Sequence, residues 1–373
     1  MKRSFLPAPV EPKMLTYLHE KARRLGVPLS GNFELTSRCN FNCKMCYIHS
    51  DNSRKKEEEL SAAQWIAIGE QAVKNGMAFL LLTGGEPLIR EDFAQIYMGL
   101  KKLGLMISVN TNGSLLQGDI LEMFKENPPL RLNISLYGAS NKTYRNLCGC
   151  ADYSKVVTNI TNAVEAGIQV KLNYSITPYN CGDMEEIFRF AGEHNLNIQT
   201  SAYMYPPLRR EDADYGENQG RLSPEQAAFY RVKSEVVHLG KDRFYEKIKN
   251  LDEVALEDAV SECGRGRNMM CRAGKSNCWV DWHGNMGMCG MVPAGDNNIL
   301  EKGFSACWET VKAGAKKVIL PQKCTECKYS AICNVCAAIC LCETGRYDTA
   351  PAYLCRYSSS TLDRIMELKA EKE

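Results

Sequence analysis

The first part of the chain alternates short apolar or β-branched runs with longer segments of helical periodicity. Six runs have the length and composition of strands, at residues 32–36, 79–83, 106–110, 130–137, 169–176 and 197–203. Helical patterns lie between them, including residues 62–74 and 92–103. Six consecutive strand–helix units predict an α/β fold whose parallel sheet closes wholly or partly, a partial (β/α)6 TIM-type barrel.

Residues suited to chemistry follow these strands where each strand ends. Cys39 comes after the first strand, 84–87 (Gly-Gly-Glu-Pro) after the second and 111–113 (Thr-Asn-Gly) after the third, while Ser135 lies near the end of the fourth. In barrels of this type the chemistry takes place in loops at the carboxyl ends of the strands. We therefore expect these segments to meet at one mouth of the barrel.

The first of these loops, CNFNCKMCY, places three thiols in the spacing C-x3-C-x2-C at Cys39, Cys43 and Cys46. A 4Fe–4S cluster held by three thiolates has one iron without a protein ligand, and that iron can bind a small molecule. Zinc bound by the same three cysteines and His49 is the competing interpretation. Glycines in the second loop let a backbone approach a ligand closely, and Glu86 and nearby carbonyls can accept hydrogen bonds from a cationic amino group.

Composition narrows the classes of function. The 373 residues include 18 cysteines, and the formal net charge is +2 from 46 basic and 44 acidic residues. This balance predicts no nucleic-acid partner and no anionic membrane surface. The N-terminal segment lacks the apolar region of a secretion signal, and the longest apolar runs are too short to span a bilayer. We therefore expect a cytoplasmic protein whose cysteines bind metal rather than form disulfides.

The cysteine loop, its aromatic Tyr47 and the segment 84–87 resemble the radical S-adenosylmethionine (radical SAM) enzymes over about residues 31–203. The resemblance implies that the open iron chelates the amino and carboxylate groups of SAM. It also implies that an electron from the cluster cleaves SAM, and that the resulting 5′-deoxyadenosyl radical takes a hydrogen atom from a substrate. It further implies a flavodoxin or ferredoxin as reductant.

By this resemblance the segment 84–87 would hold the SAM ammonium, Ser135 the ribose and Arg145 the carboxylate, while Asn173 and Ser175 on the fifth strand would contact the adenosyl group. Many members of the family have Asp at the position of Tyr137, so any contact made by that carboxylate is in doubt here. The complete set of predicted SAM contacts is Gly84, Gly85, Glu86, Pro87, Asn112, Ser135, Arg145, Asn173 and Ser175.

The C-terminal cysteines resemble the SPASM extension, which carries two auxiliary 4Fe–4S clusters. Gly284-x4-Cys289 precedes a compact run, C-x2-C-x5-C-x2-C, from Cys324 to Cys336. A zinc ribbon is the alternative, and it would leave many thiols unused. The resemblance therefore implies three 4Fe–4S clusters in all.

In that family the auxiliary ligands interleave along the chain. The resemblance implies one set of Cys271, Cys278, Cys289 and Cys336, and another of Cys324, Cys327, Cys333 and Cys355. The family pattern has three residues between the last two cysteines of the compact run, whereas this chain has two before Cys336 and six before Cys340, so either cysteine can be the eighth ligand. Cys342 has no assignment, and Cys148, Cys150, Cys181, Cys263 and Cys307 are interpreted as buried or idle thiols.

The expected organisation is a helical extension at 1–30, the radical SAM core at 31–203, a bridge at 204–262 with a helix that begins at Ser223-Pro224, the auxiliary-cluster domain at 263–357 and a helical tail at 358–373. From residue 361 this tail has the pattern of a solvated amphipathic helix.

The leading functional hypothesis is oxidative modification or cross-linking of a peptide or protein, because auxiliary clusters suit net two-electron oxidations. Gly290 stands where sulfatase-maturing relatives have an Asp that acts as a base, which argues against that activity. Fewer than 40 residues precede Cys39, too few for a fused leader-peptide-binding domain, so recognition of a precursor peptide is expected from the barrel, the bridge at 204–262 or a separate protein. The alternatives are a radical SAM oxidoreductase acting on a small metabolite or cofactor precursor and, more remotely, a non-enzymatic iron–sulfur or zinc protein.

Overall fold

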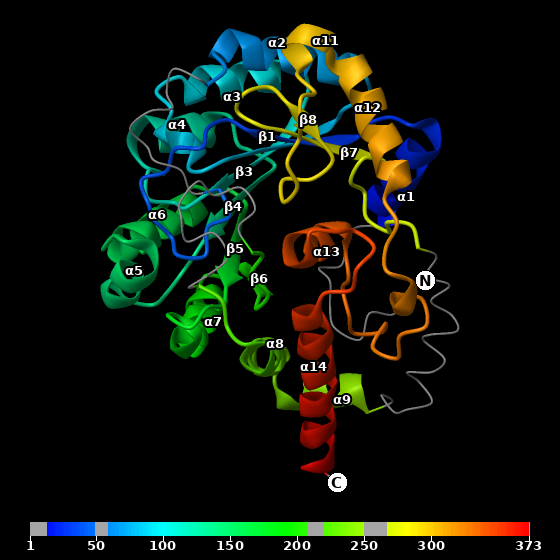
Figure 1. The fold of residues 1–373 in the computed structure, drawn as a ribbon. Coiled ribbons are helices and arrows are strands. Elements are labelled where there is room, and N and C mark those ends of the chain that lie inside the picture. The colour runs from blue at the N-terminus through cyan, green and yellow to red at the C-terminus, as the bar shows by residue number, and fades with distance from the viewer. Residues whose placement is uncertain (1–12, 49–58, 207–219, 250–266, 373) are drawn as a thin grey trace.

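The protein is described by a computed structural model that covers residues 13–48, 59–206, 220–249 and 267–372 (Figure 1). Its strands are β1 (Ser30–Glu34), β2 (Phe79–Thr83), β3 (Met106–Thr111), β4 (Arg131–Ser135), β5 (Val170–Ser175), β6 (Asn197–Ser201), β7 (Asn277–Val280) and β8 (Met286–Gly287). Its α-helices are α1 (Lys13–Leu25), α2 (Ala62–Lys74), α3 (Phe93–Lys102), α4 (Gly118–Glu126), α5 (Asn141–Cys148), α6 (Tyr153–Glu165), α7 (Met184–Glu193), α8 (Pro224–Leu239), α9 (Lys241–Ile248), α11 (Ile299–Lys302), α12 (Phe304–Lys317), α13 (Ala337–Thr344) and α14 (Ala352–Ala370). Short 3-10 helices are η2 (Pro87–Ile89), η3 (Cys181–Asp183) and η4 (Gln322–Cys324).

One curved sheet organises these elements, in the strand order β6-β5-β4-β3-β2-β1-β7-β8. The strands from β1 to β6 pair in parallel with their sequence neighbours, and the sheet stays open between β6 and β8. The predicted α/β fold with six parallel strands is therefore confirmed. The sequence pattern did not predict β7, a strand from the cysteine-rich part that pairs in parallel with β1 and extends the same sheet.

The two faces of the sheet differ in polarity. Phe33 on β1 stacks on Trp65 of α2 with ring centroids 5.2 Å apart, and the residues in register with it across the sheet, such as Leu82 and Val109, are fully buried. Alternate residues point to the opposite face because successive side chains of a strand alternate. Figure 1 shows α2, α3, α11 and α12 along one side of the sheet and α13 on the other.

Helix α8 lies within the predicted bridge and starts where its sequence predicts. Ser223 caps it: its hydroxyl accepts from the backbone N–H of Gln226, whose side chain accepts in turn from the backbone N–H of Ser223. Pro224 occupies the first turn, where its missing N–H costs nothing. This reciprocal cap fixes the start of the helix.

The prediction of a solvated tail helix from residue 361 is wrong in two respects. Helix α14 begins at Ala352, and it packs against α8 and α9. Ile365 is fully buried in a small cluster with Val232 and Phe244. The tail was misjudged because its partners, α8 and α9, lie more than a hundred residues earlier in the sequence.

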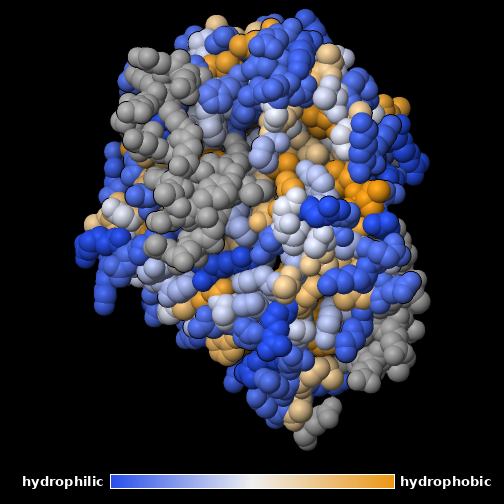
Figure 2. Space-filling model, viewed as in Figure 1, coloured by the Kyte–Doolittle hydropathy of each residue, from blue (hydrophilic) through white to orange (hydrophobic). Residues whose placement is uncertain are grey.

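The surface in Figure 2 is largely hydrophilic, with hydrophobic residues gathered in small patches. Within the described ranges, no helix has both the length and the apolar character needed to cross a bilayer.

Candidate functional site

The loops after β1 and β2 are joined by their backbones. The N–H of Gly85 donates to the carbonyl of Thr36 at 2.8 Å, and the N–H of Glu86 donates to the carbonyl of Arg38 at 2.9 Å. Gly84 has φ +135°, and a Cβ there would lie 2.3 Å from the Thr36 carbonyl oxygen; at Gly85 it would lie 2.2 Å from that of Arg38. The two glycines are therefore required where one loop passes against the other, rather than only where a ligand approaches.

Glu86 lies at the centre of this junction and is fully buried. Its carboxylate accepts from the backbone N–H of Leu88 at 3.0 Å, the hydroxyl of Thr111 at 2.8 Å and the backbone N–H of Asn112 at 2.6 Å. Burial raises the pKa of Glu86 to about 7 despite these hydrogen bonds. The side chain predicted to meet a ligand's ammonium thus fastens the loop after β2 to the loop after β3.

Asn112 ties the third loop to the cysteine loop. Its amide donates to the side chain of Asn40 at 2.9 Å and lies 3.8 Å from the sulfur of Cys39. Its carbonyl oxygen accepts from the backbone and hydroxyl of Ser114, and Asn40 donates to the same hydroxyl at 2.8 Å. The structure therefore brings 84–87, Asn112 and Cys39 together as the sequence predicted.

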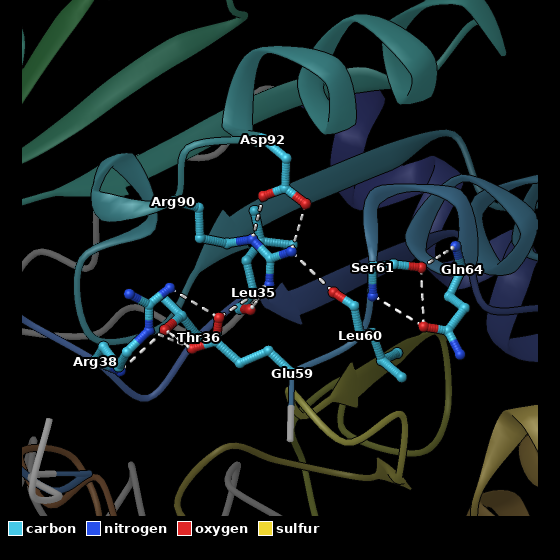
Figure 3. Close-up of polar contacts among 9 residues, drawn as sticks. All are labelled: Leu35, Thr36, Arg38, Glu59, Leu60, Ser61, Gln64, Arg90 and Asp92. Carbon is cyan, nitrogen blue, oxygen red and sulfur yellow. Dashed lines mark hydrogen bonds and ion pairs between the residues drawn. The ribbon is translucent and has the colours of Figure 1, made fainter. Parts of the chain in front are cut away.

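A buried ionic network braces the residues that lead into Cys39 (Figure 3). Arg38 binds both oxygens of Glu59 at 2.9 Å, and Thr36 donates to the same carboxylate. Arg90, with a side chain 5% exposed, contacts Glu59 at 3.4 Å and pairs with Asp92 at 2.8 Å. Sequence reasoning missed this network because Glu59 carries no motif and meets its partners only in the fold.

Arg90 also donates to two backbone carbonyls in Figure 3, that of Leu35 at 2.7 Å and that of Leu60 at 2.8 Å. Leu35 directly follows β1, and Leu60 leads into α2 through its cap Ser61. The guanidinium therefore joins three segments around the start of the cysteine loop.

The thiols of Cys39, Cys43 and Cys46 form a group suited to a cluster. Burial and the charge of Glu86 hold the pKa of Cys39 well above its usual range, and the other two thiols contribute to the same shift. Thiolates bind iron, so assembly of a cluster here must release protons. No three His, Cys, Asp or Glu side chains within the described ranges converge on one metal ion, whereas each thiolate of a 4Fe–4S cluster binds a different iron. His49, the fourth ligand of the zinc alternative, lies outside the described residues.

The side chain of Cys148 lies against the cysteine loop. Cys148 is fully buried beside Cys43, and the contact between their thiols, together with burial, holds the pKa of Cys43 well above its usual range. Two backbone hydrogen bonds, from Asn42 to Cys148 and from Lys44 to Leu147, hold the segments together. The prediction of Cys148 as a buried thiol is confirmed, but its position next to a proposed ligand was not foreseen.

Tyr137, at the position where Asp is usual in the family, also faces this loop. Its pKa is raised well above the usual range by burial and by the thiols of Cys43, Cys148 and Cys46. A hydrogen bond with Ser135 opposes that shift. The predicted ribose contact, Ser135, is therefore engaged with an aromatic hydroxyl.

The face of the sheet opposite the helices is lined with amides and hydroxyls. Ser135 and Asn173 lie side by side in register, and Ser175 is opposite Ser201. Asn133 donates to Asn110 at 2.9 Å across the neighbouring strands. Ser135, Asn173 and Ser175 therefore share one polar surface at the ends of β4 and β5.

Two predicted contacts take other positions. Arg145 is exposed on α5, whereas Tyr144 and Cys148 of the same helix are buried. Pro87 is buried in the first turn of η2, where a missing N–H is tolerated.

In the C-terminal part, a cavity is lined by Cys324, Cys327, Cys333 and Cys355, the second predicted auxiliary set. Ser358 also lines it, is 1% exposed, and its hydroxyl has no hydrogen-bond partner among the described residues. A buried donor beside four thiols fits a group that presents sulfur acceptors, so the residues present fit a 4Fe–4S cluster.

The cysteines of the first predicted auxiliary set lie on separate segments of the chain. Burial and the thiol of Cys271 raise the pKa of Cys336, whose sulfur lies 3.8 Å from the hydroxyl of Tyr205. Cys278 is fully buried on β7. No local pattern indicated the contact between Tyr205 and Cys336, which are 131 residues apart.

Two curated proteins illustrate what this chain is similar to. The AdoMet-dependent heme synthase of Methanosarcina barkeri (strain Fusaro) is 26% identical over 330 residues, which cover 84% of this chain and 93% of that protein. A probable GTP 3′,8-cyclase of Saccharolobus solfataricus is 35% identical over 170 residues, 45% of this chain, and the chain spans about half (53%) of its length.

Two solved structures share the fold. Streptococcus suis SuiB bound to S-adenosylmethionine superposes with a TM-score of 0.66 at 17% identity, covering 92% of this chain and 81% of SuiB. Native anSMEcpe with bound AdoMet gives 0.65 at 19% identity, with coverage of 92% and 100%. Residues 33–191, which carry the joined loops, match the family model of the Radical SAM superfamily. The chain thus contains a radical SAM domain, and its architecture is that of the radical SAM enzymes.

Proposed function

We propose that this radical SAM enzyme reductively cleaves SAM and abstracts hydrogen from a peptide or protein substrate, which is then oxidatively modified or cross-linked. The observation that carries the proposal is the junction of three loops, in which Cys39 is held beside Gly84, Gly85 and Asn112 at the polar end of the sheet. A cluster bound there supplies the electron that cleaves the sulfonium of SAM.

Different residues of the chain bind the cluster and the parts of SAM. Cys39, Cys43 and Cys46 hold the cluster, and the loop 84–87 lies beside it. Because the Glu86 carboxylate is occupied by Thr111 and Asn112, we expect backbone carbonyls of this loop, rather than that carboxylate, to accept from the SAM ammonium. Ser135, Asn173 and Ser175 provide the polar wall for the adenosyl group.

The accessory parts of the proposal follow the sequence organisation. The segment 263–357 carries two auxiliary 4Fe–4S clusters, after a core at 31–203 and a bridge at 204–262, and a flavodoxin or ferredoxin supplies electrons. We place the enzyme in the cytoplasm, with a separate leader-peptide-binding protein as a further partner. The cavity lined by four cysteines supports one of these clusters.

A peptide substrate is favoured by the solved neighbours. SuiB has been solved bound to the precursor peptide SuiA, and anSMEcpe with the Cp18Cys peptide; these folds cover 94% and 93% of this chain. Gly290 argues against sulfatase maturation, because a Cβ at this position would lie 2.4 Å from the ring of Trp279 and leaves no room for an Asp. Modification of a peptide at another residue type is therefore the first candidate.

A small metabolite is the second candidate, and a different observation favours it. The heme synthase of M. barkeri matches this chain over 93% of its own length, further than the cyclase does. Its name indicates that it forms heme, a macrocycle rather than a peptide.

The test is anaerobic turnover of the reconstituted protein with SAM and dithionite, with 5′-deoxyadenosine measured by chromatography. Candidate precursor peptides and a tetrapyrrole are added in parallel, and mass spectrometry follows each. A mass loss of whole hydrogen pairs in a peptide supports the first candidate. Change in the tetrapyrrole alone supports the second, and no SAM cleavage with an intact cluster contradicts both.

A further inference from the structure

Cys278 faces the helices that cover the sheet. It lies opposite Gly31 in the parallel pair of β1 and β7, and Val280 lies opposite Phe33, which stacks on Trp65. A Cβ added to Gly31 would be 3.6 Å from the sulfur of Cys278. The thiol therefore points into the hydrophobic layer between the sheet and α2.

The loop that carries Cys289 lies against the other face of the same strand. Trp279 points away from Cys278 because neighbouring side chains of a strand alternate. The ring of Trp279 packs so closely on Gly290 that a Cβ there would come within 2.4 Å of it. Because Gly290 directly follows Cys289, the β7 backbone separates the thiol of Cys278 from the Cys289 loop.

Another thiol reaches that loop from α13. The sulfur of Cys342 lies 3.6 Å from the carbonyl oxygen of Met291. Met291 belongs to the tight turn closed by the hydrogen bond from Val292 to the carbonyl of Cys289, at 3.1 Å. Cys342 and Cys289 are thus brought to one turn of the chain.

Cys336 approaches the same place from the start of α13. Its sulfur accepts from the backbone N–H of Ile339 at 3.4 Å and lies 3.8 Å from the Tyr205 hydroxyl. Burial raises the pKa of Tyr205, and the thiols of Cys336, Cys289 and Cys342 all contribute. One tyrosine thus lies within electrostatic reach of three thiols.

The thiols themselves show the same grouping. Burial, then Cys336 and Cys289, raises the pKa of Cys342 to about 12, and Cys271 contributes to the raised pKa of Cys336. Burial raises the pKa of Cys278 to about 12 as well, but no neighbouring thiol is among the causes. The pKa of Cys340 is raised by burial, by Cys336 and by thiols of the second auxiliary set, so Cys340 lies toward that set.

We propose that Cys342, and not Cys278, completes the first auxiliary cluster together with Cys271, Cys289 and Cys336. This ligand set rests on the proposed function, which requires an auxiliary cluster at this place. Both ends of α13 then contribute a ligand, Cys336 and Cys342. Cys278 is a core residue of β7 and takes no part in binding iron.

The test compares Cys342→Ala and Cys278→Ala in the full chain, reconstituted anaerobically with iron and sulfide. Wild type should hold about twelve irons. We expect Cys342→Ala to lose about four, or to show an altered auxiliary signal in the electron paramagnetic resonance spectrum, and Cys278→Ala to keep all of them. Cys340→Ala tests the remaining thiol of α13, and Cys307→Ala, at a buried thiol of α12, is the matched control; both should keep about twelve irons.

A cluster lost from Cys278→Ala or Cys340→Ala but kept in Cys342→Ala overturns the assignment. Folding is checked by the SAM-dependent change in the spectrum of the first cluster, which Cys342→Ala should retain. Differential alkylation of wild type gives a second measurement: Cys342 should be protected in the loaded protein and modified after chelation, and equal labelling in both states contradicts the proposal. If wild type holds only about four irons yet still cleaves SAM, it binds no auxiliary cluster; the proposed ligand set then fails while the proposed SAM cleavage stands.

Discussion

The carboxylate of Glu86 accepts a 2.6 Å hydrogen bond from the backbone N–H of Asn112, 26 residues further along the chain. Since Asn112 in turn lies 3.8 Å from the sulfur of Cys39, one buried acid connects the loop after β2 to a predicted cluster ligand. Burial raises its pKa to about 7 from 4.5. Glu86 therefore gains or loses its proton near neutral pH, close to the predicted cluster ligand Cys39.

Glu86→Gln should change how stability depends on pH. Because the folded-state pKa is raised, the contribution of the protonated acid is complete below about pH 4.5 and is lost as the pH rises through about 7. Relative to the variant, which has no titrating group here, wild type should lose about 3 kcal/mol of unfolding free energy over this window. Denaturant unfolding of reduced, metal-free protein at a series of pH values measures the difference.

Glu122→Gln is the matched control, because Glu122 pairs with Lys125 at the surface. Its difference from wild type should stay nearly constant over the same pH range. A constant difference for Glu86→Gln as well would show that the pKa of Glu86 is not raised.

Gly85→Ala should separate the two loops. Its Cβ would lie 2.2 Å from the carbonyl oxygen of Arg38, which is backbone and cannot rotate away. We expect a loss of about 1–3 kcal/mol in unfolding free energy. Displacing Cys39 by about 1 Å should lower SAM cleavage roughly 100-fold.

Thermal unfolding and 5′-deoxyadenosine formation measure these two effects. Gly192→Ala is the control, since nothing lies within 4 Å of its added Cβ and it is on helix α7. It should leave cleavage unchanged and be neutral or slightly stabilising. Equal behaviour of the two variants would contradict the close approach.

The sequence was most informative where the signal was local. Strands such as Phe79–Thr83 and the cap of α8 were predictable, because apolar runs and a Ser-Pro helix start are short-range patterns. The order of the motifs also predicted that Cys39 and Asn112 would meet, since parallel strands present their carboxyl ends together.

The pairing of strands that lie far apart in the sequence could not be predicted from such short-range patterns. Strand β7 has only four residues, and nothing in them indicates that β1 is its neighbour. The choice of Cys278 as a ligand followed the order of cysteines, whereas the direction of its side chain depends on that pairing. Glu86 was predicted to face a ligand, because its buried partners on β3 cannot be read from the segment 84–87.

Glu59→Gln should destabilise the loop that leads to Cys39. It removes the charge that faces Arg38 and Arg90, whose side chains are 14% and 5% exposed. Breaking a buried pair costs about 3–5 kcal/mol, because the remaining charge loses its partner. Asp348→Asn breaks the exposed pair with Arg346 and should lower the free energy of unfolding far less. Chemical denaturation compares the two, and equal losses would refute the structural role of the network in Figure 3.

Cys43→Ala and Cys327→Ala should separate SAM cleavage from product formation. Cys43 is a proposed ligand of the first cluster, so its loss should remove about four irons and abolish 5′-deoxyadenosine formation. Cys327 lines the cavity of the second predicted auxiliary set, so its loss should also remove about four irons while some cleavage remains and product is lost. Cys181→Ala should retain both activities.

The first of these variants needs one more control, because the thiol of Cys148 lies against Cys43 and can take its place as a ligand. In the Cys43→Ala/Cys148→Ala double variant no such replacement is available. Residual cleavage in Cys43→Ala that disappears in the double variant would identify Cys148 as the substitute. Full cleavage in the double variant would contradict the assignment of the first cluster, since only Cys39 and Cys46 of its three ligands would remain.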